Sequence, residues 1–128
     1  MDPSIGARVF SLLSTDSDVA ARVGSRIYPG RAPQDSAFPR IVYTIVDAMP
    51  LATFEGNTSN MTKARVQIDC YDRRYYDTDR LMESIMDAFK TWNGVGHRAL
   101  HLARRDLYED TFELFRVTSD FSLWIREI

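Results

Sequence analysis

Cysteine is almost missing from this sequence, whose 128 residues include a single one, Cys70. One cysteine excludes a disulfide within the chain and is typical of proteins that fold in a reducing compartment. Long apolar runs are missing too, since none approaches the roughly 20 residues that a membrane-spanning helix needs. The first residues carry neither a basic segment nor an apolar stretch, so we expect no signal peptide. The sequence therefore predicts a protein without a membrane partner.

An excess of charge of one sign is also lacking, because 16 Lys and Arg face 18 Asp and Glu, a formal net charge of -2. No overall field therefore attracts the protein to nucleic acid or to a membrane surface. The sequence contains no internal repeat, no low-complexity run and no linker, so residues 1–128 are expected to form a single domain. A domain of this size buries about two thirds of its unfolded surface, which suffices for a core.

Helical spacing of apolar residues marks the N-terminal segment and one central segment. Asp2 is the expected N-cap of the first helix, whose apolar pattern ends at residues 14–16. Ser17 is expected to begin a short second helix that ends at Val23, with Gly24 as its C-terminal cap. The central helix is expected to run for about four turns from a cap at Asp77 or Thr78 to residue 92.

Most of the remaining sequence shows the patterns of β-strands. Strands are predicted over residues 40–46, 63–71, 98–108 and 111–128, with a short extended piece at 26–28. The clearest one places Ala64, Val66, Ile68 and Cys70 on one face and polar residues on the other. Residues 31–39 and 49–61 are predicted to be loops. The order of elements predicts an α+β fold: a mostly antiparallel sheet with the two N-terminal helices and the central helix packed on one face.

The residues that usually carry catalysis or bind metals do not form a convincing set. His97 and His101 are four residues apart, but in a strand that spacing covers about 13 Å, too far for one shared ion. Cys70 lies on a predicted core face, where a thiol is unreactive. Asp69 and Asp72 lie near a strand end and a helix start, where acids are expected for capping. We therefore expect no catalytic residue, no metal site and no cofactor, and an enzyme built around Asp69, Asp72 and His101 is the weakest alternative.

A short segment at residues 73–76 interleaves two arginines with two tyrosines. Arg73 and Arg74 are candidate contacts for nucleic acid, with Arg104 and Arg105 as a possible extension of the same platform. The alternative is a loop whose tyrosines anchor it to the fold while the arginines stay in solvent. The acidic charge balance and the lack of an RNA-binding signature favour this second interpretation.

Aromatic residues on the polar faces of the predicted strands indicate an interaction surface. Trp124 and Tyr71 lie opposite the core faces of their strands, and Tyr43 or Val42 does so on the first long strand. Arg65, Arg116 and Arg126 flank them as a charged rim. Phe54 and Arg31, from the two predicted loops, complete the candidate interface. The alternative is that the N-terminal helices cover this face within one copy.

A series of short motifs in a fixed order resembles the tail-completion proteins of long-tailed bacteriophages. These motifs are VGSRIYP (23–29), APQ (32–34), FPRIVY (38–43), ARVQIDCY (64–71), RDLYE (105–109) and SDFSLW (119–124). The resemblance covers nearly the whole chain, and it rests on the order and spacing of the motifs because each one is weak alone.

The resemblance implies a structural protein of the tail-terminator kind, with an α+β fold and no catalytic residues. Such proteins form a ring, usually a hexamer, at the head-proximal end of the tail tube. The ring stops polymerisation of the major tail-tube protein and joins the tail to the head connector, while DNA passes through the lumen without specific binding. The implied location is the virion, after assembly in the host cytoplasm. The alternative function is a small α+β module that binds nucleic acid.

Overall fold

The computed structural model of the protein describes residues 4–52, 58–92 and 97–126. Its elements, in chain order, are α1 (Ile5–Thr15), α2 (Ser17–Val23), β1 (Ile27–Pro29), β2 (Arg40–Ala52), β3 (Thr58–Asp72), α3 (Tyr75–Lys90), β4 (His97–Glu109) and β5 (Leu114–Arg126). The strands form one sheet in the order β1-β2-β3-β5-β4. Strand β1 runs parallel to β2, and the other neighbours are antiparallel. The predicted α+β fold is confirmed.

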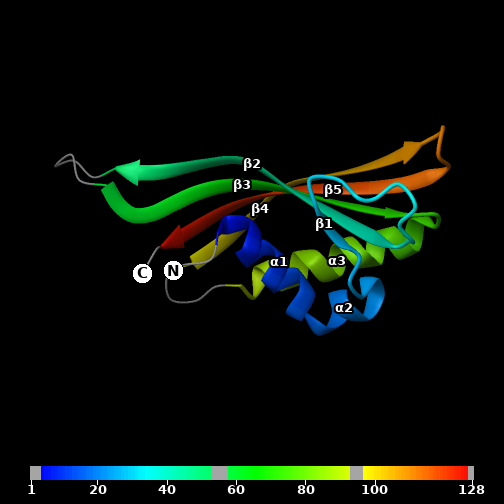
Figure 1. Ribbon diagram of the computed structural model, residues 1–128, viewed down its shortest axis with the longest axis horizontal. Coiled ribbons are helices and arrows are strands. Elements are labelled where there is room, and N and C mark those ends of the chain that lie inside the picture. The colour runs from blue at the N-terminus through cyan, green and yellow to red at the C-terminus, as the bar shows by residue number, and fades with distance from the viewer. Residues whose placement is uncertain (1–3, 53–57, 93–96, 127–128) are drawn as a thin grey trace.

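The three helices lie together on one face of the sheet, and among the described residues the opposite face carries no helix (Figure 1). We call the uncovered side the open face. Its side chains on the two central strands are Lys63, Arg65, Gln67, Asp69 and Tyr71 of β3 and Arg116, Thr118, Asp120, Ser122 and Trp124 of β5. The helices therefore do not cover the face on which the sequence placed Trp124 and Tyr71. No helix among the described residues is long and apolar enough to cross a membrane.

The core lies between the sheet and the helices. The predicted inner face of β3 is confirmed, because Ala64, Val66, Ile68 and Cys70 are all buried. From α3, the fully buried Phe89 stacks on Phe121 of β5, with 4.2 Å between ring centroids. Burying one such side chain contributes about 2–3 kcal/mol to stability. This packing orients the sheet and leaves its other face free.

The two N-terminal helices meet at Asp16 rather than at Ser17. The Asp16 side chain accepts hydrogen bonds from the backbone N–H groups of Asp18 and Val19, both at 3.1 Å, so Asp16 is the N-cap of α2. Helix α1 extends through Thr15, and Ser4 caps its start by accepting from the N–H of Ala7. The predicted break at residues 14–16 is therefore confined to one residue. The predicted cap Asp2 lies outside the described residues.

The start of α3 and the extent of the β2–β3 hairpin also differ from the sequence prediction. Helix α3 begins at Tyr75, and its N-cap Arg74 makes no side-chain capping hydrogen bond. Thr78 is instead fully buried, and its hydroxyl donates to the carbonyl of Arg74 at 2.8 Å. The loop predicted for residues 49–61 is largely strand, because β2 continues to Ala52 and pairs with β3 across two register shifts. A proline such as Pro50 is tolerated in an edge strand.

Candidate interaction surface

A groove of about 680 Å³ lies on the open face, at the end of the sheet where β2 begins. Loop residues 30–34 and Phe38 form one wall, while Glu109, at the end of β4, and Phe112, in the β4–β5 turn, form the other. The floor consists of side chains from β2, β3 and β5. Of the predicted interface residues, the groove brings together Tyr71, Arg116 and Arg31.

The floor of the groove is held by a set of charged groups around Asp69. This carboxylate is buried, with only 4% of the residue exposed, and it accepts hydrogen bonds from Arg116 at 3.1 Å and Gln67 at 3.1 Å. Arg116 also donates to Glu109 at 3.4 Å. Buried charges persist only when they are paired and hydrogen-bonded, so these contacts make a fixed polar floor. Burial raises the pKa of the neighbouring Tyr71 above its ordinary value.

Among the described residues, the arginines at the other side of the groove have no carboxylate partner. Arg40 lies over the rings of Phe38 and Tyr71, at 4.4 and 5.5 Å from their centroids. Its Nη1 donates to Ser36, but its buried Nε has no hydrogen-bond partner. Arg73 lies over the same Phe38 ring at 5.4 Å. Within the part of the chain that the structure describes, neither Arg31 nor Arg73 forms an ion pair.

A second hollow on the open face surrounds Trp124. It measures about 490 Å³, and its apolar lining includes Met49, Leu100, Leu102 and Trp124. The first three side chains are about half exposed, at 52%, 53% and 47%. Lys63 lies 5.5 Å from the centroid of the Trp124 ring. The predicted aromatic anchor thus sits in an exposed apolar patch, which is typical of a surface that another molecule covers.

Between these two hollows lie small polar residues whose burial was not predicted from the sequence. Thr118, Asp120 and Ser122 of β5 lie on the open face yet are buried. Longer neighbours on β3 and β4 cover them, and Asp120 accepts from Arg65 at 3.0 Å. The sequence feature that accompanies this burial is the series of short polar side chains on β5. It predicts burial only when the strand order is known, because the same side chains on an edge strand would stay exposed.

One predicted interface residue, Tyr43, does not lie on the open face. Tyr43 is buried in the core on the helix-covered face, near Gly6 of α1, so its prediction as an interface residue was wrong. Val42, the alternative, points to the open face and lines the groove. The reason is register: Tyr43 pairs with the inward-facing Ile68. Phe54 lies outside the described residues.

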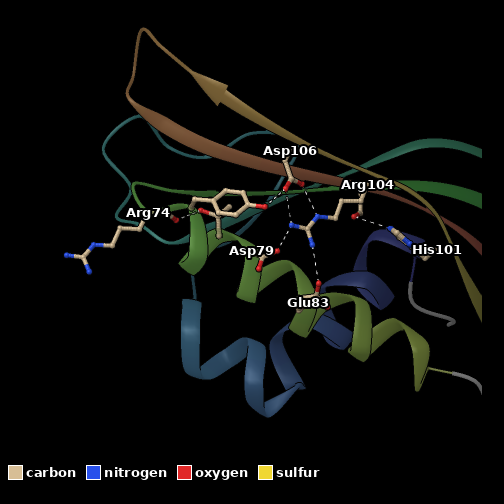
Figure 2. A network of polar contacts seen from close by, with 9 residues as sticks. Arg74, Asp79, Glu83, His101, Arg104 and Asp106 are labelled. Atoms are coloured by element: carbon tan, nitrogen blue, oxygen red, sulfur yellow. Dashed lines mark hydrogen bonds and ion pairs between the residues drawn. The ribbon is translucent and has the colours of Figure 1, made fainter.

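Arg126, Arg73 and Arg74 are exposed, but they lie at different places. Arg126 ends β5, whereas Arg73 and Arg74 form the turn between β3 and α3. Arg74 points away from the fold (Figure 2). The possible extension through Arg104 is not formed, because Arg104 binds Asp79, Glu83 and Asp106 between α3 and β4 (Figure 2). A continuous basic platform is therefore missing from the described surface.

The groups considered for catalysis do not come together either. Cys70 is fully buried, and burial raises the pKa of its thiol well above the ordinary value. His101 lies on the helix-covered side and contacts the Ser119 hydroxyl at 3.2 Å, while Asp69 faces the opposite side of the sheet. Over residues 4–52, 58–92 and 97–126, no three His, Cys, Asp or Glu side chains are arranged to hold a metal ion.

Comparisons with known proteins give a family match and a similar fold, each over nearly the whole chain. The model of the family described as Tail completion protein gp17 matches residues 7–126. Among solved structures, a chain of the virion of a native gene transfer agent particle has the same fold, with a TM-score of 0.76 and 16% sequence identity. The similarity covers 97% of this chain and 96% of that one. No curated protein matches the sequence.

Proposed function

We propose that this chain, which belongs to the Tail completion protein gp17 family, caps the head-proximal end of a phage tail tube as a ring. The ring stops polymerisation of the major tail-tube protein and provides the surface that joins the tail to the head connector. The family match over residues 7–126 carries this proposal. The shared fold with a chain of a gene transfer agent virion supports it. The protein acts by binding and catalyses no reaction.

The two faces of the sheet suit a subunit of an assembly. One face is fully used by the three helices, so the fold is complete without the other (Figure 1). The open face keeps an apolar patch around Trp124 and a charged groove with unpaired arginines. Permanent assemblies commonly bury more than about 2,000 Å² at each interface, and these two areas supply surface of the required kind.

A ring, with six copies as the expected number, also fits the edges of the sheet. Strand β4 is an edge along its whole length, and β1 covers β2 only at residues 41–43. Different surfaces at the two edges give head-to-tail contacts, which close into a ring when the rotation between copies is right. DNA passes through such a ring without specific binding, because the protein has a slight negative net charge of -2 and does not grip phosphates.

Tube growth in the presence of the purified protein tests this function. Tail-tube protein is allowed to polymerise with and without the chain, and tube lengths and ends are measured by negative-stain microscopy. We expect tubes that stop growing, with a ring at one end that then binds purified connector. Unchanged tube length together with bare tube ends would refute the proposal. A nucleic-acid-binding module would instead bind DNA strongly with a steep dependence on salt.

A further inference from the structure

Two segments of opposite charge lie at the same end of the sheet. We define the basic end as residues 26–40 together with residues 72–74, whose charged residues are Arg26, Arg31, Arg40, Arg73 and Arg74 against Asp35 and Asp72. Five arginines minus two aspartates give a charge of +3. We define the acidic turn as residues 109–113, where Glu109, Asp110 and Glu113 give -3 with no Lys or Arg among them.

The two segments have the same height along the strands but opposite positions across the sheet. One row of paired residues runs from Arg40 through Tyr71 and Arg116 to Leu107. The basic end therefore adjoins the start of β2, near one edge, and the acidic turn follows the end of β4, at the other edge. Figure 1 shows both at the same end of the elongated sheet.

Each segment keeps charges that are not paired within one copy, although Glu109 of the acidic turn pairs with Arg116. Among the described residues, Arg31, Arg73 and Arg74 have no carboxylate within ion-pair distance, and neither Asp110 nor Glu113 has a cation. The Nε atom of Arg40 is buried without an acceptor, which is a costly state for a charged group.

The acidic turn also has the shape and the apolar group of a docking element. Phe112 at its tip is 68% exposed. Glu113 has a φ of 51°, a left-handed conformation that costs a residue other than glycine roughly 1 kcal/mol or more. Such strain is retained where a turn must keep a defined form, and this turn carries the exposed Phe112 and, among the described residues, two unpaired carboxylates.

We propose that the acidic turn of one copy docks on the basic end of the next copy around the ring, with its Phe112 beside the Phe38 and Arg40 of that neighbour. This inference rests on the proposed function, because it describes how the copies of the ring meet. Complementary surfaces at equal height and opposite edges close into a ring by rotation about an axis parallel to the strands. Surfaces at unequal height give an open helix instead.

A second copy fits this end of the molecule better than DNA. Among the described residues, the unpaired Arg31, Arg73 and Arg74 of the basic end are matched by the unpaired Asp110 and Glu113 of the acidic turn, so docking leaves no large excess of charge. Contacts of this kind weaken as salt rises, since exposed charges are screened over about 8–10 Å at physiological ionic strength.

Reciprocal charge reversal tests the contact. One variant carries Arg31→Glu and Arg73→Glu, a second carries Asp110→Arg and Glu113→Arg, and a third carries all four changes. Copies are counted by sedimentation of the free protein and by chemical cross-linking on capped tail tubes. We expect each double variant to lower the association constant tenfold or more, because like charges then meet, and the fourfold variant to recover most of it. Arg80→Glu, an exposed reversal on α3, is the control and should associate like the wild type.

Several outcomes would overturn the proposal while leaving the proposed function intact. In the first, both double variants still cap tubes and form the same cross-linked rings as the wild type. In the second, the fourfold variant associates no better than the double variants. Loss of binding to a 20-base-pair DNA duplex in the Arg31→Glu, Arg73→Glu variant alone, with unchanged rings, would assign the basic end to DNA. Should a reversed variant fold poorly by circular dichroism, Arg31→Gln with Asp110→Asn replaces it, and a weakened ring is again the expected result. Tubes that the wild type never caps refute the function itself.

Discussion

At the scale of single residues, Arg104 is the side chain whose loss should cost the most stability among the surface charges. It pairs with Asp79, with Glu83 at 3.2 Å and with Asp106 at 2.9 Å, and so connects α3 to β4 (Figure 2). Only 19% of its side chain is exposed, so removing it leaves three partly shielded carboxylates close together. We expect Arg104→Met to lower the free energy of unfolding by about 1–3 kcal/mol, measured by urea denaturation. Arg105→Met, which changes an exposed neighbour on the other face, should have almost no effect, and equal losses in both variants would disprove the network.

The same network predicts how stability depends on pH. The hydrogen bond from Arg104 holds the pKa of Asp106 below its ordinary value. A carboxyl whose pKa is lower in the folded than in the unfolded state stabilises the fold above its unfolded pKa of about 3.9, and this contribution disappears as the pH falls through the folded pKa. The urea midpoint should therefore fall less between pH 6 and pH 3 in Arg104→Met than in the wild type. Parallel midpoint curves for the two proteins would show that Arg104 does not set this pKa.

Residue positions were predictable from the sequence where alternation alone decides them. The inner face of β3 was found correctly because the pleat sends alternate side chains to opposite faces. Tyr43 was misplaced because both faces of β2 are apolar. The sequence pattern therefore does not show which face of β2 points to the core, and only the pairing with β3 decides it. Two partners of Arg104, Glu83 and Asp79, were not foreseen, since they come from α3, 21 and 25 residues earlier in the chain.

At the scale of the elements, the junction of α1 and α2 depends on the Asp16 cap. Its carboxylate accepts from two backbone N–H groups that α2 cannot satisfy internally. We expect Asp16→Ala to reduce the free energy of unfolding by about 1 kcal/mol, while Asp16→Asn retains most of it. Ser17→Ala, at the start predicted from the sequence, should leave thermal unfolding almost unchanged. A larger loss from the Ser17 change than from the Asp16 change would restore the sequence prediction.

The identity of the elements was easier to predict than their limits. Apolar periodicity located the helices and the long strands, because burial of one face fixes the repeat. The β2–β3 hairpin was underestimated, since Pro50 and a polar run are signals of a loop when they stand alone. Pairing with β3 overrides these signals, because an edge strand needs a partner on one side only.

At the scale of the whole molecule, the sequence alone indicated an exposed interaction face but not its shape. The exposed aromatics suggested a partner surface, and the strand order then separated it into a groove and an apolar patch. The groove combines β1–β2 loop residues with the β4–β5 turn, which are about 75 residues apart in the sequence and share no local pattern. Residues that are distant in the sequence come together through the topology of the sheet, and no sequence motif predicts such contacts.

The apolar patch around Trp124 provides the last prediction, which separates assembly from folding. Trp124 lies outside the core, on the open face, next to the exposed Met49, Leu100 and Leu102. Trp124→Ala should therefore lower the melting temperature by less than a core change does, because Trp124 is only partly buried within the monomer. Capping of tail tubes should fall tenfold or more, since a buried aromatic anchor commonly contributes about 2 kcal/mol or more to an interface. Phe121→Ala, on the opposite face of the same strand, is the matched contrast and should destabilise the monomer by about 3–5 kcal/mol. If Trp124→Ala melts as early as Phe121→Ala, the tryptophan belongs to the fold of the monomer rather than to the surface that joins copies or virion partners.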